Sequence, residues 1–332
     1  MTRILVTGGA GYVGSVSVEA FLAAGHDVVV LDDLSTGHRS AVSDGARLIV
    51  GDYTDRAGTG ALFAEESIDA ILHCAARSLI GESLRQPARY FQENVAGGIA
   101  LLEAAREAGV RRFVLSSTAA VYGVPDTTPI PEEAPLRPIN PYGETKRSLE
   151  AVLTWYGRAY DIRSVSLRYF NVAGATEAIG EDHDPETHLI PAILAAAEAG
   201  RAVTIFGADY PTRDGTNVRD YIHVADLADA HLRAIEATAP GDGRIGDGLL
   251  VCNLGNGDGF TNLEVVRAAE AVVGRGIPHE VGPRRPGDPA TLVASAGRAA
   301  EVLGWRPQHP SLDGMVGSAW AWRRSHRGGY RD

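Results

Sequence analysis

The chain has 332 residues, of which 45% are hydrophobic, so it is long enough for a large core and for two domains. Its formal net charge of −11 argues against nucleic acid and anionic membranes as partners, and an anionic ligand would need a local basic patch. The only two cysteines, Cys74 and Cys252, exclude a disulfide framework and a cysteine-rich metal site, and we expect no metal.

The first predicted element is a strand at residues 4–6, which is followed by a glycine-rich turn and a helix at 15–24. The strand begins too early for a signal peptide, and no run reaches transmembrane length, so we expect a cytoplasmic protein. The turn fits the dinucleotide spacing G-x-G-x-x-G, in which glycines let the backbone approach a pyrophosphate at the helix start. The glycines of this turn are Gly8, Gly9, Gly11 and Gly14.

A second strand, at 28–31, is followed by the acidic pair Asp32 and Asp33. A carboxylate at Asp32 can accept hydrogen bonds from both hydroxyls of an adenine ribose, and it would repel the additional phosphate of NADP. Strand, glycine turn, helix, strand and acid in this order predict that the chain binds NAD. Arg39 keeps NADP open as an alternative, because an arginine just past this point can hold a 2′-phosphate.

Three further strands are predicted at 47–50, 68–74 and 113–115, with helices such as 91–108 between them. This alternation predicts an α/β fold, with a Rossmann-type doubly wound parallel sheet. Ligands of such sheets bind beyond the carboxyl ends of the strands. Asp52, just past the third strand, either hydrogen-bonds an adenine amino group or caps the next helix. Small or polar residues also follow the other strands, namely Ala75, Ala76, Ser116 and Thr118.

A helix predicted at 142–160 begins with Tyr142 and Lys146, which share one helix face because they are four residues apart. A tyrosine phenol, with an unperturbed pKa of about 10, is a poor base at neutral pH. A lysine ammonium one turn away stabilises the phenolate, and the hydroxyl of Thr118 can share the substrate proton. Together these residues can remove a proton from an alcohol while hydride leaves its carbon for a nicotinamide.

The second half of the chain has a different pattern from the first. A sixth strand is predicted at 164–168, and glycine, proline and acidic residues dominate from about residue 174. A helix at 188–199 and short strands at 203–206 and 249–254 follow. This change of pattern predicts a second unit after the nucleotide-binding one.

We therefore predict two domains. The first, at 1–175, is an NAD-binding Rossmann domain, and the second, at 176–332, is a smaller α/β domain for the substrate. The chain is expected to return to the first domain near 221–237.

Motifs along essentially the whole chain resemble the extended short-chain dehydrogenase/reductase family, and within it the nucleotide-sugar 4-epimerases. The segments at 205–224 and 283–288 resemble nucleotide-sugar enzymes specifically, whereas the glycine turn is widespread. Ser78 stands where some members carry lysine, and Val16 where histidine is usual. The matching motifs lie at 7–14, 81–83, 141–146, 168–171, 205–207, 218–224, 283–288 and 303–305.

The resemblance implies NAD-dependent epimerisation at C4 of a UDP-hexose, by oxidation to a 4-keto sugar, rotation of that sugar and return of hydride to its other face. Tyr142 would be the base, Lys146 its modulator and Thr118 its hydroxyl partner. The implied NAD contacts are Gly8, Gly11, Tyr12, Val13, Gly14, Asp32, Asp33, Asp52, Tyr53, Ala75, Ala76, Asn94, Ser116, Tyr142, Lys146 and Tyr169. The implied UDP-sugar contacts are Thr118, Asn171, His188, Leu189, Thr204, Ile205, Phe206, Arg219, Tyr221, Arg285, Asp288 and Leu292.

Two of these residues set expectations about the substrate. Arg219 and Arg285 would supply the positive charge that a diphosphate needs. In the family, one position after the Arg-x-Gly-Asp motif sets the room beside C2 of the hexose, and an ungapped count places Leu292 there. Leucine should favour UDP-glucose and UDP-galactose over UDP-N-acetylglucosamine, unless Leu292 is merely a core residue.

Other functions stay open beside UDP-hexose epimerisation. A UDP-N-acetylhexosamine or UDP-pentose 4-epimerase would share the same motifs. A nucleotide-sugar 4,6-dehydratase needs an acid and a base beside Thr118, where Ala119 and Ala120 stand. A non-enzymatic NAD-dependent regulator usually lacks the tyrosine–lysine pair. The resemblance also implies a homodimer through the helices at 94–108 and 142–160, and a role in galactose metabolism.

Overall fold

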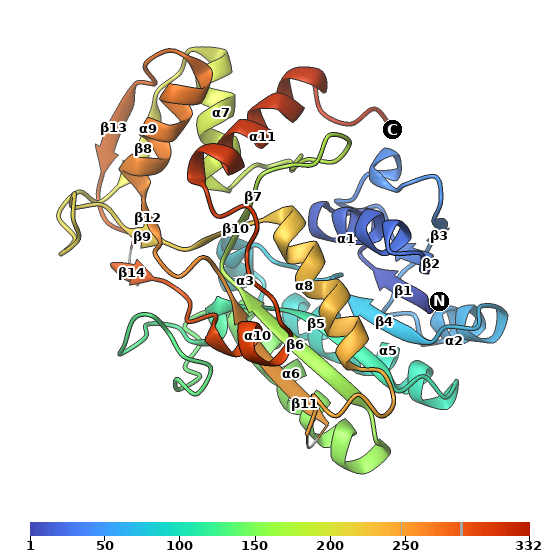
Figure 1. Ribbon diagram of the computed structural model, residues 1–332. Helices are drawn as coiled ribbons and strands as arrows, with labels where there is room; N and C mark the ends of the chain where they lie inside the picture. Colours follow the sequence, from blue (N-terminus) through green and yellow to red (C-terminus); the bar gives the residue numbers. More distant parts are fainter. Residues whose placement is uncertain (247, 286–287) are drawn as a thin grey trace.

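The computed structural model describes residues 1–246, 248–285 and 288–332. A seven-stranded parallel sheet in the order β11-β6-β5-β4-β1-β2-β3 runs through the molecule (Figure 1). This architecture confirms the predicted Rossmann-type α/β class. The strands of the sheet are β1 (Arg3–Thr7), β2 (Asp27–Asp32), β3 (Arg47–Val50), β4 (Ala70–His73), β5 (Arg112–Thr118), β6 (Arg163–Tyr169) and β11 (Leu249–Leu254).

Helices cover both faces of the sheet, which explains why its strands read as continuous apolar runs. In β1, Ile4 and Val6 belong to the core with α1 and α8, whereas Leu5 belongs to the opposite core with α2, α5 and α6. This alternation follows from the two-residue period of a strand. The covering helices are α1 (Tyr12–Ala23), α2 (Arg56–Glu65), α5 (Gly98–Glu107), α6 (Pro141–Tyr160) and α8 (Val224–Ala237).

The helix predicted at 91–108 is longer and less regular than expected. It is built from α4 (Pro87–Tyr90), a π-helical stretch at Phe91–Gly97, and α5. A π-helical stretch inserted between α-helical segments is often found at a functional site. Asn94, one of the predicted NAD contacts, lies within it.

Strand β11 differs from the sequence prediction, which placed residues 249–254 in the second domain. It is the edge strand of the main sheet, where Leu249 pairs with Ser164 and Leu254 with Tyr169 of β6. Its residues alone could not reveal this, because pairing with β6 joins segments far apart in the sequence. Helix α8 also packs on the main sheet and against α1. The domain division at residue 175 stays a prediction.

A smaller group of elements extends from the top down the left side of Figure 1, beside the main sheet. Its helices share a core that includes Ile193, Val266 and Met315. No helix among the described residues is long and apolar enough to cross a membrane. The group contains β7 (Asn171–Ala173), α7 (Leu189–Ala199), β8 (Val203–Phe206), β9 (Val218–Arg219), β10 (Tyr221–His223), β12 (Phe260–Thr261), α9 (Asn262–Val273), β13 (His279–Gly282), β14 (Thr291–Leu292) and α11 (Leu312–Ser325). The remaining short helices are α3 (Ile80–Arg85), α10 (Gly297–Val302) and the 3-10 turns Arg39–Ala41 and Ala119–Val121.

Candidate active site

The glycine turn between β1 and α1 requires glycine at two positions. Gly8 has φ +72°, and a Cβ atom there would lie 2.6 Å from the nitrogen of Ala75. A Cβ atom on Gly14 would lie 2.1 Å from the carbonyl oxygen of Gly8. The turn is therefore packed against the end of β4, as the sequence predicted from the carboxyl-end rule.

The start of α1 leaves backbone donors for a ligand. Its N-cap, Gly11, has no side chain to accept from the first amides, and the first turn carries no acidic residue. The amides of Tyr12 and Val13 lie in this first turn, where a helix has no intrahelical acceptors for its N–H groups. Together with the helix dipole, these donors suit an anionic diphosphate.

Asp32 lies at the end of β2, beside the glycine turn. One carboxylate oxygen accepts from the amide of Ala10 at 2.9 Å, and the other accepts from the amide of Leu34 at 2.9 Å. Burial raises the pKa of Asp32, and these two hydrogen bonds act in the opposite direction. Each carboxylate oxygen keeps a second lone pair, so Asp32 can still accept from two ribose hydroxyls.

Asp52 does not cap the helix that follows it. Asp55 caps α2 by accepting from the amide of Ala57 at 3.0 Å, whereas Asp52 accepts from the amide of Thr54 at 2.8 Å. The capping alternative for Asp52 is therefore wrong, and the adenine contact stays a prediction. The neighbouring Tyr53 donates its hydroxyl to the carbonyl of Glu93 at 2.8 Å.

The catalytic candidates come together at the end of β5. Lys146 is buried and donates to the carbonyl of Ser116 at 2.8 Å. Burial raises the pKa of Tyr142, and a hydrogen bond with Thr118 lowers it. Burial lowers the pKa of Lys146 to about 8, although Cys74 and Glu150 act in the opposite direction. A lysine with this pKa is still largely an ammonium ion at neutral pH.

Asn94 uses both of its amide hydrogens within the protein. Its side-chain nitrogen donates to the carbonyl of Arg77 at 2.9 Å and to the hydroxyl of Thr145 at 3.1 Å. Its oxygen accepts from the amide of Arg77 at 2.8 Å. The contact between Asn94 and NAD stays a prediction. In the Asn94 side chain, only the second lone pair of the oxygen is left to accept a hydrogen bond from the cofactor. Ser78, the departure from the family pattern, is exposed next to Arg77.

Two buried polar networks behind the catalytic candidates could not be predicted from the sequence. The imidazole of His231 on α8 lies 2.9 Å from the hydroxyl of Ser116 and 3.0 Å from the hydroxyl of Ser17. Burial lowers the pKa of His231 to about 3, so this histidine is neutral. A histidine in the otherwise apolar stripe of the 224–237 helix was the only signal in the sequence.

The second network holds α6 against the sheet. Glu150, one turn after Lys146, accepts from the hydroxyl of Ser117 at 2.6 Å and from the guanidinium of Arg168 at 3.0 Å. Arg168 also donates to the hydroxyl of Tyr122 at 2.8 Å. Both members of the Glu150–Arg168 pair are almost fully buried. The network therefore fixes the helix that carries Tyr142.

Several of the predicted substrate residues lie on the short strands of the smaller group. Leu292 of β14 pairs with Arg219 of β9, and Arg219 forms an ion pair with Asp288. The guanidinium of Arg285 lies 4.1 Å from the centre of the Phe206 ring. Residues 286–287 of the predicted motif lie outside the described residues.

Leu292 connects these residues to the catalytic ones. It packs against an apolar cluster that contains Ala119, the residue next to Thr118. Leu292 is only partly buried, so the structure leaves room for both its predicted roles. Val16, the other departure from the family pattern, packs with Tyr12 and Ile179, as expected for a change in packing.

The other predicted substrate residues divide by their exposure. Asn171 donates to the carbonyl of Asp220 at 2.9 Å, and Ile205 and Tyr221 are buried in the core of the smaller group. Thr204 is exposed on β8, and Leu189 is half-buried at the start of α7. The remaining predicted NAD contacts also differ in exposure. Asp33 is exposed, whereas Ala76 and Tyr169 are half-buried at the ends of β4 and β6.

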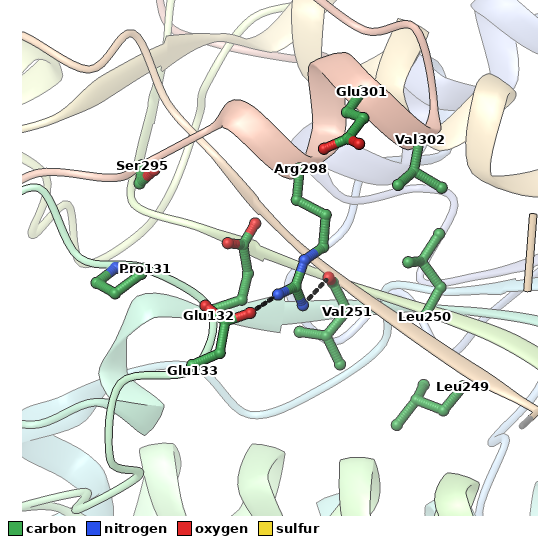
Figure 2. A pocket seen from close by; sticks show the side chains of 10 residues that line it. All are labelled: Pro131, Glu132, Glu133, Leu249, Leu250, Val251, Ser295, Arg298, Glu301 and Val302. Carbon is green, nitrogen blue, oxygen red and sulfur yellow. Dashed lines mark hydrogen bonds and ion pairs between the residues drawn. The ribbon is translucent and has the colours of Figure 1, made fainter. Parts of the chain in front are cut away.

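A cavity of about 570 Å³ lies elsewhere, along the edge strand β11 (Figure 2). Arg298 crosses it, where it forms an ion pair with Glu133 and donates to the carbonyl of Val251 at 3.3 Å. None of its described lining residues is a predicted site residue. The candidate active site therefore lies at the carboxyl ends of the main strands and not in this cavity.

Comparison with known proteins defines the class. Residues 4–246 match the NAD dependent epimerase/dehydratase family, and the chain belongs to this family. It is similar to the UDP-glucose 4-epimerase of Streptococcus mutans, with 51% identity over 99% of both chains. It is also similar to a crystal structure of a UDP-glucose 4-epimerase, with 46% identity, a TM-score of 0.96 and coverage of 99% of this chain and 100% of that chain. A third similar protein, with 35% identity, is the UDP-glucose 4-epimerase from Bifidobacterium longum in complex with NAD+ and UDP, whose TM-score is 0.92 over 99% of this chain and 100% of that chain. The family resemblance found in the sequence is confirmed.

Proposed function

We propose that this enzyme is an NAD-dependent epimerase that interconverts UDP-glucose and UDP-galactose at C4 of the hexose. The observation that carries the proposal is the group of Thr118, Tyr142 and Lys146 at the end of β5. This group lies on the same sheet edge as the glycine turn and Asp32, which suit a dinucleotide. About 50% identity to named UDP-glucose 4-epimerases over nearly the full length supports the same activity.

NAD would supply the acceptor for the hydride of C4 and would return that hydride. Tyr142 would take the proton of the C4 hydroxyl through its phenolate oxygen and give it back after the sugar has turned. Thr118 would hold the same hydroxyl by a hydrogen bond, since it already bonds to Tyr142. Lys146, fixed on the Ser116 carbonyl, would stabilise the phenolate by its charge.

The residues near Thr118 favour epimerisation over dehydration. A dehydratase needs an acid and a base to remove water across C5 and C6, and Ala119 and Ala120 offer neither. A regulator without activity would have no need of a buried lysine one turn from a tyrosine at this edge. We also propose a role in galactose metabolism, and the cytoplasmic location stays a prediction.

The activity is tested by incubating the purified enzyme with UDP-galactose, without added NAD, and separating the products by chromatography. We expect UDP-glucose to form until both sugars reach a fixed ratio, which should be the same when the reaction starts from UDP-glucose. A 4-keto-6-deoxy product would instead indicate a dehydratase. No product from an enzyme that carries NAD would support the regulator.

The cofactor should be NAD, with one molecule retained per chain through purification. Asp32→Ala should lower NAD affinity about 10–100-fold, because it removes hydrogen bonds to a charged acceptor. Asp44→Ala is the control. It changes an exposed acid in the same N-terminal part of the chain and should leave NAD binding as in the parent. The bound nucleotide is released by denaturation and identified by chromatography. If NADP were found, the argument from Asp32 would fail and Arg39 would become the residue of interest.

The hexose preference should depend on Leu292. A change in the room beside C2 is worth ~1–3 kcal/mol, or roughly 10–200-fold. We expect Leu292→Ser to raise kcat/KM for UDP-N-acetylglucosamine relative to UDP-glucose within this range. Leu292→Phe should move the ratio the other way. Equal ratios in the parent and both variants would show that Leu292 only fills the core.

We further propose that the enzyme is a homodimer that pairs through the helices at 94–108 and 142–160. Two large apolar side chains are exposed on α6, and a third is exposed on α3, which packs against α6. Trp155 is 65% exposed and Tyr160 43% exposed on α6, and Leu84 is 61% exposed on α3. Exposed large apolar side chains are common at protein–protein contacts, which supports this proposal.

A further inference from the structure

Four side chains converge in the loop that leads from β7 to α7. Glu181, His183, Glu186 and His188 each offer one ligand atom, and these atoms all lie within 4.8 Å of one another. The sequence alone predicts no metal, because its two cysteines cannot form a cysteine-rich site. The pattern E-x-H-x-x-E-x-H contains no cysteine and brings its four members together only when the loop folds.

The distances between these atoms suit one small metal ion. The Nδ1 atom of His188 lies 2.7 Å from Oε1 of Glu181 and 3.1 Å from Oε1 of Glu186. The Nδ1 atom of His183 lies 3.2 Å from Oε1 of Glu181 and 3.9 Å from Oε2 of Glu186. Four ligands in a tetrahedron, with metal–ligand bonds of about 2.0–2.1 Å, would be separated by about 3.3 Å.

Burial within the cluster is unusual for groups of this chemistry. The side chain of Glu181 is only 7% exposed, although it is a carboxylate. The Nδ1 atom of His183 is hidden from solvent and makes no well-aligned hydrogen bond among the described residues, although it lies close to Oε1 of Glu181. The imidazole nitrogens and carboxylate oxygens of this cluster face one another around a partly buried point, and a cation held there would bind a lone pair of each.

We propose that Glu181, His183, Glu186 and His188 bind one divalent transition-metal ion, for which Zn²⁺ is the most suitable. The donor set consists of two neutral imidazole nitrogens and two anionic carboxylate oxygens. Zn²⁺ binds such ligands in tetrahedral geometry. Calcium and magnesium are disfavoured, because they prefer sets made entirely of oxygen. Since the described protein atoms fill all four positions, the site is a structural one.

The ion would fix the loop where it contacts the C-terminal segment around Tyr330 and where it leads into α7. Asp182, inside the loop, accepts from the amide of Tyr330 at 2.9 Å, and the hydroxyl of Tyr330 bonds with Gly180 at 3.1 Å. The loop ends at His188, the N-cap of α7, and Leu189 is the first residue of that helix. If the proposed function holds, the ion would also position these two residues for the UDP-sugar, but the metal site does not depend on that function.

The site is tested on the full-length enzyme after treatment with a chelator and dialysis. Zn²⁺ binding is measured by isothermal titration calorimetry, and Co²⁺ is added to record the visible absorption of a tetrahedral site. We expect one ion per chain and an intense cobalt band. His183→Ala and Glu186→Gln should each weaken Zn²⁺ binding by more than about 100-fold, since removal of a ligand should exceed the 10–100-fold loss caused by outer-shell changes.

His279→Ala, at an exposed histidine of β13, is the matched control and should bind Zn²⁺ as the parent does. Circular dichroism and retained NAD report whether each variant is folded. If His183→Ala fails to fold, Glu186→Gln and the parent still decide the question. No stoichiometric binding by the parent, or equal binding by the parent and the folded ligand variants, would overturn the proposal and leave the four side chains as ion pairs only.

Discussion

Replacing Tyr142 with phenylalanine should lower kcat by about 10²–10⁴-fold, the usual contribution of a general acid–base group. The change removes only the phenolic hydroxyl, whose hydrogen bond with Thr118 lowers the pKa of Tyr142. Because Lys146 keeps its bond to the Ser116 carbonyl, the site behind Tyr142 should stay in place. Steady-state rates with UDP-galactose measure the effect.

Two measurements separate a catalytic loss from a structural one. The variant should still retain NAD and bind UDP, which is checked by nucleotide analysis and by calorimetry. Tyr160→Phe, at the far end of the same helix and partly exposed, should keep the parental rate. A turnover number for Tyr142→Phe equal to that of the parent would remove this residue from the mechanism.

Glu150→Ala should lower the free energy of unfolding by about 3–5 kcal/mol. The change leaves the guanidinium of Arg168 buried without its carboxylate partner, and only 4% of that side chain is exposed. It also removes the acceptor of the Ser117 hydroxyl. Urea denaturation followed by circular dichroism measures the loss.

The same helix offers a matched control. Glu144 pairs with Arg147 one turn away, but both side chains are considerably exposed, at 32% and 45%. Exposed ion pairs of this kind contribute at most about 1 kcal/mol, so Glu144→Ala should change stability little. Equal losses in the two variants would contradict the view that the buried pair anchors α6.

The parts of the fold that the sequence predicted are those with local signals. The glycine turn, Asp32 and the Tyr142–Lys146 spacing each lie within one or two elements, so the spacing alone indicates their geometry. Apolar runs with turn residues between them predicted six strands of the sheet. The structure adds the reason why Gly14 has no substitute, since a Cβ atom there would meet the Gly8 carbonyl.

The parts that could not be predicted depend on contacts between distant segments. Residues 249–254 look like any short strand, and only pairing with β6 places them in the main sheet. Asp52 and Asp55 are both acids before a helix, and the backbone path decides that Asp55 is the cap. The partners of Arg168 and His231 come from other elements, so neither network has a spacing to recognise.

In the proposed reaction, hydride leaves C4, stays on the bound cofactor and returns to the same carbon. The most direct test uses UDP-galactose with deuterium at C4, incubated with the enzyme and no added NAD. Mass spectrometry and NMR then locate the label in the product. We expect UDP-glucose that keeps deuterium at C4. UDP-glucose that has lost the label to solvent, or deuterium gained at C4 from heavy water with unlabelled substrate, would contradict it.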